Sequence, residues 1–537
     1  MKLKYKSLFV LIGLLSIASC TLSPNTGGDS HVPSDDDDYT IIDPEPMEDT
    51  FVNPNLNPIE KPSSGMTTIN VVSINDFHGA VQEERGIGLK KVGTYLRQQA
   101  GIENTLTLDQ GDTWQGSIYS NYNHGQLIND VYSYAHVSAR TVGNHDFDWG
   151  VEVLKHNTAR SYAGYKTPVL AANVYDYDFT SKIEGNTQQS NIGDKSVSYT
   201  LKNGLKVGIV GTIGEKQITS IDSNNTHDVC FKSHVNIIKE EATSLRNNGC
   251  DVVIATCHAD QDDLINNSLN EYVDLVLCAH SHQREEYQED NLHYYQFGSY
   301  GNAIGKITLT YDYETNTITS TDAQTLEKSD LDMMITDIDQ NVEYLVNHYN
   351  SQCDEAANVV VASNANGKFS NSYNLTNLMC RALYDECKLE KYNVAFTYAN
   401  QARSSIWKST WTYSDLYQAF PFDNKVYIVD IYGSDILREV VNYNNVYYNP
   451  TFTKRVDPEK KYRIAVIDYL LFHTNTSRTY DYFRRFDGSY VGILKNNYRV
   501  ILKNWLIKNG YNKGALLNAD DYDSNLSQFN RTEIIAE

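Results

Sequence analysis

Five short polar clusters, each following an apolar run of strand length, contain the residues with the clearest chemistry in this sequence. Their side chains are mainly Asp, Asn and His, which supply the oxygen and nitrogen ligands that divalent transition metals accept. A pair of such metals can hold a phosphoryl group and generate hydroxide near neutral pH. The sequence therefore predicts one metal site suited to phosphoester hydrolysis. The clusters are Asp76-Phe77-His78, Gly111-Asp112, the run from Gly143 to Asp148, His258, and His280-Ser281-His282.

A single cluster of this kind could also be a turn, because Asp, Asn and Gly are common where a strand ends. Turns do not require histidine, however, and several of these loops contain it. All five clusters together therefore favour a metal site. The other histidines, such as His124, His136, His156 and His293, are interpreted as ordinary surface or core groups.

The apolar runs before the clusters predict the strands that carry them. Patterns typical of helices at 89–99 and 235–247 separate several of these runs, which indicates a layered α/β domain. In such sheets the carboxyl ends of the strands meet at one edge, so side chains far apart in sequence can converge there. The predicted strands lie at 69–74, 105–108, 139–142, 207–210, 251–257 and 273–278.

The chain of 537 residues is longer than one core usually serves, which predicts two domains. Residues 302–319 alternate as in a strand hairpin, and apolar residues then recur at helical spacing from Leu331 to Tyr349. We therefore place an α/β domain at 67–327, one linker helix at 328–352 and a smaller α+β domain at 353–537. In the last domain the pattern predicts helices at 375–389 and 414–419 and strands at 394–397 and 425–431.

The first 19 residues have the features of a secretory signal peptide: three early lysines, an apolar stretch at 8–15 and small residues before Cys20. The apolar stretch is short for a membrane span. Small residues before a cysteine resemble the lipobox of bacterial lipoproteins, which implies lipidation of Cys20 and attachment to the cell membrane, at the surface or in the periplasm. An ordinary signal peptide is the alternative. Residues 20–66, rich in Pro, Ser, Asn and Asp, are predicted to be a disordered tether.

The formal net charge of −23 makes the chain strongly acidic. A nucleic-acid backbone would be repelled by this field, so we expect no stable nucleic-acid partner. A small phosphate substrate would need local positive charge, which bound metal ions can supply.

The motifs as a set resemble the 5′-nucleotidase family, a two-domain group whose N-terminal half is a calcineurin-like metallophosphoesterase. The family's motifs appear as Asn75-Asp76-Phe77-His78-Gly79, as Gly111 to Ser117 and as Gly143 to Asp148, followed by His258 and by Ala279-His280-Ser281-His282. Only Ala279 departs from the usual glycine. The resemblance extends from about residue 67 to the C-terminus and implies a four-layer α/β/β/α catalytic domain joined by a helix to the smaller domain.

The resemblance also implies the roles of these residues. Two divalent ions, of zinc, manganese, cobalt or iron, would be bound, the first by Asp76, His78 and His282 and the second by Asn144, His258 and His280, with Asp112 bridging them. His145 and Asp148 would form a catalytic dyad that faces the phosphate. Attack would be by metal-bound hydroxide.

The second domain matches the family less closely. The family's Asn-Gly-Gly-x-Arg appears as Asn400-Gln401-Ala402-Arg403, and an additional family arginine finds only Asn371. Asn400 and Arg403 are candidate substrate residues, and the resemblance implies that Phe422 and Tyr469 stack on a nucleobase. A core position for Phe422 and a surface salt bridge for Arg403 are the alternatives.

These observations together predict a secreted hydrolase that acts on nucleotides, most simply releasing phosphate from nucleoside 5′-monophosphates. The same site could cleave 2′,3′-cyclic nucleotides, nucleotide sugars or other phosphoesters. A surface binding protein or adhesin that keeps the fold without turnover is the alternative of another class.

Overall fold

The computed structural model of the protein describes residues 41–84, 86–177, 189–440, 446–448, 456–472 and 483–523. The predicted signal peptide, Cys20 and the first half of the predicted tether lie outside these residues. Across the described residues, no helix combines the length and apolar character that crossing a bilayer requires.

Two six-stranded sheets form the centre of the first domain. The first has the order β14-β13-β1-β2-β3-β4 and the second the order β11-β12-β10-β9-β7-β6. In each sheet neighbouring central strands run parallel, as in the pairs β1–β2 and β7–β9. The first sheet contains β1 (Met66–Ile74), β2 (Thr105–Asp109), β3 (Ala139–Thr141), β4 (Val169–Leu170), β13 (Ala303–Asp312) and β14 (Thr317–Glu327); the second contains β6 (Ser196–Thr200), β7 (Lys206–Ile213), β9 (Val252–His258), β10 (Leu275–Cys278), β11 (Arg284–Glu289) and β12 (Leu292–Phe297).

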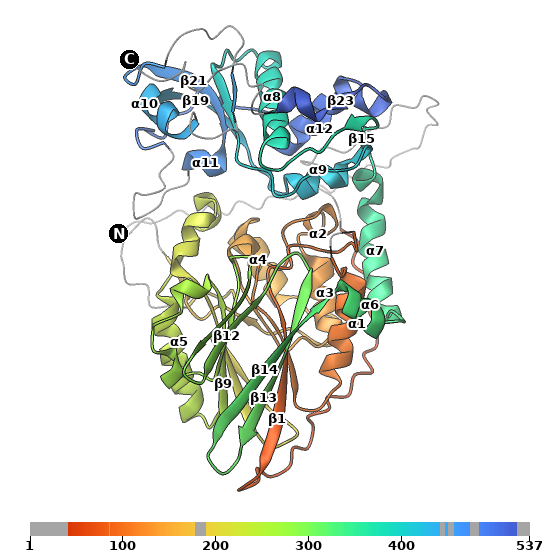
Figure 1. Ribbon diagram of the computed structural model, residues 1–537, viewed down its shortest axis with the longest axis vertical. Coiled ribbons are helices and arrows are strands. Elements are labelled where there is room, and N and C mark those ends of the chain that lie inside the picture. Colours follow the sequence, from red (N-terminus) through yellow and green to blue (C-terminus); the bar gives the residue numbers. More distant parts are fainter. Residues whose placement is uncertain are drawn as a thin grey trace, which may run out of the picture. The chain divides into compact units, whose positions relative to one another are not determined.

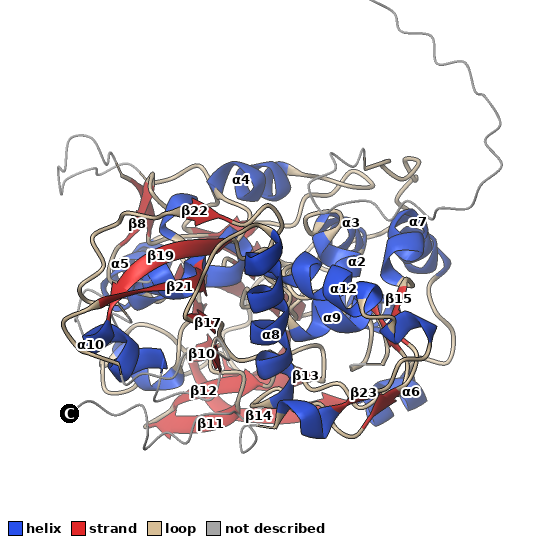
Figure 2. Cartoon of the chain, turned by 90° about the horizontal axis from the view of Figure 1, so that it is seen from above, coloured by secondary structure: helices blue, strands red, loops and turns tan. Residues whose placement is uncertain are grey.

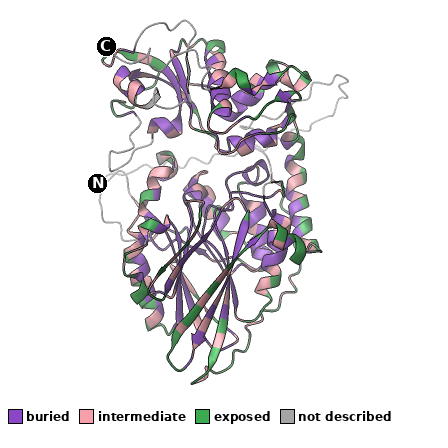
Figure 3. Ribbon diagram, viewed as in Figure 1, coloured by how far each residue is buried: buried purple, intermediate pink, exposed green. Residues whose placement is uncertain are grey.

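The sheets pack face to face and are covered by helices on their outer sides (Figure 1). Apolar residues of both sheets, such as Val71 and Ile209, form one buried cluster between them. Helix α1 (Leu89–Ala100) contacts β2 of the first sheet, and α5 (His234–Asn247) contacts β7 and β9 of the second. The predicted four-layer α/β/β/α arrangement is therefore confirmed, as are both helices and the hairpin β13–β14. Figure 3 shows the buried residues concentrated in the strands and on the inner faces of the helices.

The predicted single linker helix is wrong, because two helices occupy this segment. Helix α6 (Lys328–Met334) ends before Ile335, and α7 (Gln340–Ala357) begins five residues later. The side chain of Asp339 accepts hydrogen bonds from the backbone N–H groups of Asn341 and Val342, which caps α7. Asp at this position stabilises the start of a new helix. The helical spacing of apolar residues in the sequence therefore runs across a break between two helices.

The smaller domain contains a five-stranded sheet of order β20-β17-β21-β19-β22 and several helices, which confirms the predicted α+β class (Figure 2). Helix α8 contacts both β17 and α12. The main elements are α8 (Asn374–Leu389), β17 (Phe396–Tyr398), α9 (Tyr413–Ala419), β19 (Val426–Tyr432), β20 (Val446–Tyr448), β21 (Lys461–Ile467), α11 (Asp468–Phe472), β22 (Gly492–Ile493) and α12 (Tyr498–Lys508).

The described part of the predicted tether, residues 41–65, is held against the first domain and is not a free spacer. Asp49 pairs with Arg97 at 2.7 Å and also contacts His136. Lys61 pairs with Asp251 at 2.6 Å. The prediction of disorder is wrong for these residues, because their charged side chains form specific ion pairs. The prediction used only the polar composition of the segment, which does not reveal such partners.

Candidate metal centre

The predicted ligands lie in loops at one edge of the two sheets. Residues Asp76, Asp112 and His280 follow the strands β1, β2 and β10, and His258 ends β9. Glycines allow the loops to approach closely: a Cβ atom on Gly143 would overlap the carboxylate of Asp112. The parallel strand order therefore brings together side chains that are up to about two hundred residues apart.

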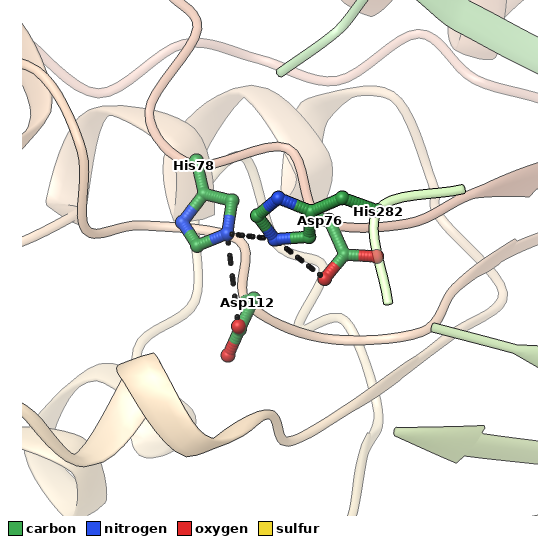
Figure 4. Close-up of side chains that lie close together, drawn as sticks. All are labelled: Asp76, His78, Asp112 and His282. Atoms are coloured by element: carbon green, nitrogen blue, oxygen red, sulfur yellow. Dashed lines mark hydrogen bonds and ion pairs between the residues drawn. The ribbon is translucent and has the colours of Figure 1, made fainter. Parts of the chain in front are cut away.

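The first group consists of Asp76, His78, Asp112 and His282, whose ligand atoms all lie within 4.8 Å of one another (Figure 4). The Nε2 atoms of His78 and His282 are 3.0 Å apart. The Nε2 atom of His282 is 3.5 Å from Oδ1 of Asp76, and that of His78 is 3.7 Å from Oδ2 of Asp112. Four donor atoms thus converge on one point.

The second group shares Asp112 and adds His258 and His280. Oδ2 of Asp112 is 3.2 Å from Nε2 of His258. Oδ1 of Asn144 lies 3.1 Å from Nε2 of His258 and 3.0 Å from Nδ1 of His280. All seven predicted ligands are therefore brought together, with the Asp112 carboxylate between the two groups.

The protonation states of His280 and His282 fit metal binding. Burial lowers the pKa of His280 to about 4 and that of His282 to about 3, so both imidazoles are neutral and offer a lone pair. Nδ1 of His78 faces the carbonyl of Gln115 at 2.9 Å, and Nδ1 of His258 faces that of Gln110 at 2.8 Å. A carbonyl oxygen accepts a hydrogen bond only from an N–H group, so Nδ1 of both rings carries a proton, and in a neutral ring Nε2 then presents its lone pair to the cluster.

The carboxylates also fit cations. Asp76 is fully buried, and burial raises the pKa of its carboxyl to about 7. Oδ2 of Asp112 is buried and pairs with Nε2 of His258 at 3.2 Å. Burial lowers the pKa of His258, but Asp112 outweighs this effect and raises it to about 10. The negative charge of Asp112 thus stabilises a positive charge on His258, and it would stabilise a divalent cation at the same place.

The loop backbones are strained at the ligands. Asp76, His78, Asp112, His280 and His282 have φ between 47° and 78°, the left-handed region that non-glycine residues rarely adopt. Each such residue costs about 1 to 3 kcal/mol, and residues of this kind cluster at functional sites.

His145 and Asp148 lie beside the cluster and are joined by a hydrogen bond of 2.8 Å between Nδ1 and Oδ2. The backbone N–H of His145 donates to Oδ1 of Asp112 at 2.7 Å. Burial lowers the pKa of His145, but the carboxylates of Asp148 and Asp112 outweigh this effect and the net pKa is raised. The imidazole can therefore carry a proton near neutral pH.

A cavity of about 340 Å³ opens next to this dyad and is lined by all four candidates from the smaller domain, Asn400, Arg403, Phe422 and Tyr469. The Phe422 ring stacks on His145, with centroids 5.1 Å apart and planes at 26°. The turn before it is held by Pro421, whose carbonyl accepts from Nε2 of Gln115 at 2.9 Å and Nδ2 of Asn121 at 3.0 Å. Phe422 is thus half-buried at the site and not in the core.

Sequence reasoning missed several residues that the structure adds. Tyr300 stacks on His78, and its hydroxyl accepts from Nε of Arg403 at 3.1 Å. Trp149, Asp222 and Asp468 line the cavity. Tyr300 follows β12 at the same sheet edge as the ligands, in a Gly298-Ser299-Tyr300-Gly301 turn. That position after a strand was the one signal that could have identified it.

Comparisons with known proteins match each of the two domains to a family. Residues 69–284 match the family of calcineurin-like phosphoesterases, and residues 356–451 match the 5′-nucleotidase C-terminal domain. A 5′-nucleotidase of Diplobatis ommata is 28% identical over 227 residues, which cover 40% of this chain and 37% of that protein. An apyrase of Aedes albopictus is 25% identical over 300 residues, 48% of this chain and 51% of that protein.

The chain thus spans about half or less of the length of these curated relatives. Among solved structures, a 5′-nucleotidase precursor from Thermus thermophilus is similar with a TM-score of 0.68 and 17% identity, over 84% of this chain and 97% of that one. This likeness shows a shared fold across both domains.

Proposed function

We propose, from the membership of this chain in the two-domain 5′-nucleotidase family, that it is a phosphohydrolase that releases phosphate from nucleotides, most simply from nucleoside 5′-monophosphates. The observation that carries the proposal is the Asp112 carboxylate shared by two convergent donor groups, beside a histidine–aspartate dyad and an open cavity.

Two divalent ions would be held by these donors. Asp76, His78 and His282 would bind the first, Asn144, His258 and His280 the second, and Asp112 both. Zinc, manganese, cobalt or iron would suit the mixed nitrogen and oxygen ligands. When bound, a pair of ions neutralises charge on the phosphoryl oxygens and lowers the pKa of water.

The protein's own groups would then complete the reaction. Nδ1–H of His145 donates to Asp148, so a second proton on Nε2 would be available for the leaving alkoxide. The guanidinium of Arg403 would hold phosphoryl oxygens by charge-assisted hydrogen bonds. Asn400, Phe422 and Tyr469 line the space that the nucleoside would occupy.

The N-terminal assignment is part of the proposal: lipidation of Cys20 would hold the enzyme on the outer side of the cell membrane. Cys20→Ala should release the protein into the soluble fraction and abolish incorporation of a labelled fatty acid. Unchanged labelling in this variant would rule out Cys20 as the lipidated residue.

The main test is a product survey with purified protein and added manganese or zinc, across nucleoside monophosphates, diphosphates, 2′,3′-cyclic nucleotides, nucleotide sugars and an aryl phosphate. We expect phosphate release from monophosphates, lost in Asp112→Asn together with bound metal. Asp322→Asn, which changes an exposed carboxylate on β14, is the matched control. Metal binding without hydrolysis of any phosphoester would refute the proposal and favour the binding-protein alternative.

A further inference from the structure

Arg403 is the only lysine or arginine among the described residues that line the cavity. Capture of a phosphoryl group from the side of the smaller domain therefore depends on one guanidinium. Because this group is planar and donates in fixed directions, its orientation decides whether it can bind two phosphoryl oxygens.

Tyr300 lies between Arg403 and the metal centre. Its hydroxyl accepts from Nε of Arg403 at 3.1 Å. Its ring stacks on His78 at 5.0 Å between centroids and meets the edge of His282 at 5.2 Å. Its backbone N–H donates to the carbonyl of Asp76 at 2.7 Å. One tyrosine thus contacts three candidate ligands of the first metal and the phosphate-binding side chain.

The backbone of Tyr300 is held in an unusual conformation. Its φ is 54°, which is rare for a bulky side chain. The following Gly301 also has a positive φ, and its carbonyl accepts from the backbone N–H of Ile87 at 2.8 Å. A Cβ atom on Gly301 would crowd the Phe77 ring, so this turn fits only glycine after Tyr300. Strain of this kind, next to a candidate site, is a sign that the position of the side chain matters.

The hydrogen bond to Tyr300 holds the Nε side of the Arg403 guanidinium and leaves its two terminal nitrogens unbound by that residue. Nε donates to the tyrosine, and the plane also lies over the Phe422 ring at 5.6 Å. Among the described residues, neither terminal nitrogen of Arg403 has a hydrogen-bond partner. Both are therefore available as a fork for an anion.

We propose that Tyr300 is a positioning residue that orients the Arg403 fork toward the phosphoryl group. The inference rests on the proposed function. It assigns Tyr300 no proton transfer and no metal coordination.

The test is Tyr300→Phe, which keeps the ring against His78 and removes only the hydroxyl. We expect the KM for a nucleoside monophosphate and the inhibition constant of inorganic phosphate to rise about tenfold, a change in the range of one charge-assisted hydrogen bond. The kcat and the metal content by elemental analysis should change little. In an Arg403→Ala background the same substitution should have no further effect, because the group that it orients is gone.

Tyr311→Phe is the matched control, since its hydroxyl also lies beside a cation, Lys61, but β13 places it opposite Thr67 at the start of β1, whereas the ligands follow the end of that strand. Unchanged phosphate inhibition in Tyr300→Phe, multiplicative losses in the double variant, or loss of bound metal would each overturn the inference. Phosphate inhibition is also measured with an aryl phosphate as the substrate. A protein that hydrolyses no nucleotide would refute the proposed function, and the aryl phosphate assay would still decide the role of Tyr300.

Discussion

Replacing Asp148 by Asn is the sharpest test of the dyad. The change keeps the shape of the side chain but removes the charge that faces Nδ1 of His145 at 2.8 Å. Asp148 is the main group that raises the pKa of His145 against the opposing effect of burial. In the variant the imidazole should therefore be neutral at pH 7, and its ability to protonate an alkoxide should fall.

The size of the loss follows from the contact. The side chains of His145 and Asp148 are only 12% and 18% exposed, so solvent screens the pair weakly. A hydrogen bond between such charged partners contributes about 1.5 to 3 kcal/mol. Since 1.36 kcal/mol corresponds to a factor of about ten, we expect kcat to fall about 10- to 150-fold.

The assay compares two leaving groups under the same metal conditions. A nucleoside 5′-monophosphate leaves as an alkoxide that requires a proton, whereas p-nitrophenyl phosphate leaves as a stable phenolate that does not. We expect the full loss with the nucleotide and less than about a fivefold loss with the aryl ester, because general-acid catalysis contributes only to the former. Glu152→Gln, in an exposed carboxylate four residues along the chain, is the control.

Equal losses on both substrates would refute the reasoning. They would mean that the dyad stabilises phosphoryl charge or orders the Asn144 loop and does not deliver a proton. A loss that coincided with loss of bound metal would point to the loop, since the His145 backbone N–H donates to Asp112.

Three further outcomes are expected. A chelator should abolish activity and lower the Tm of the wild type, because metal at a hundredfold excess over its Kd adds about 2.7 kcal/mol to the free energy of unfolding. An equal fall in the Tm of Asp112→Asn on chelation would contradict a metal site shared through Asp112. Phe422→Leu should raise the KM of nucleotides about three- to tenfold, the range of one lost aromatic contact, and equal KM values would show that the ring does not contact substrate. Burial and the neighbouring Asp222 raise the pKa of Asp468 to about 7, so this carboxylate is charged at pH 8 and neutral at pH 6. The rate with ADP relative to AMP should therefore increase several-fold between pH 8 and pH 6, because the additional phosphate of ADP is no longer repelled, and Asp468→Asn should remove the pH dependence of that ratio.

Much of the first domain could be predicted because its signals are local. Each ligand stands directly after an apolar run, and a run of strand length can be recognised without knowledge of its neighbours. Parallel pairing then brings the carboxyl ends of these runs to one edge, which is why Asp76, Asp112 and His258 meet. The layered arrangement followed from this periodicity together with the family resemblance.

The misses have the opposite character, since each depends on a contact between distant residues. Asp49 reads as a solvated acid until Arg97 and His136 are placed beside it. Tyr300 is one of 40 tyrosines in the sequence, and only the fold brings it to Arg403. The break between α6 and α7 is different, because Asp339 was a visible capping residue that the continuous apolar spacing concealed.

Buried charged residues below the ligands hold the ligand loops in place without a bound metal ion. Beneath the cluster, the fully buried Arg140 approaches Asp146 at 3.5 Å and lies over the Trp114 ring at 3.7 Å. Asp146 in turn accepts from the backbone N–H groups of Gly143 and Thr113, and so ties two ligand loops together. The negative charge of Asp146, which holds the loops together, is thus compensated by Arg140 of the protein itself. Asp112 faces His78 and His258 instead and makes no ion pair with a lysine or arginine among the described residues, so a bound divalent cation would be favourable beside it.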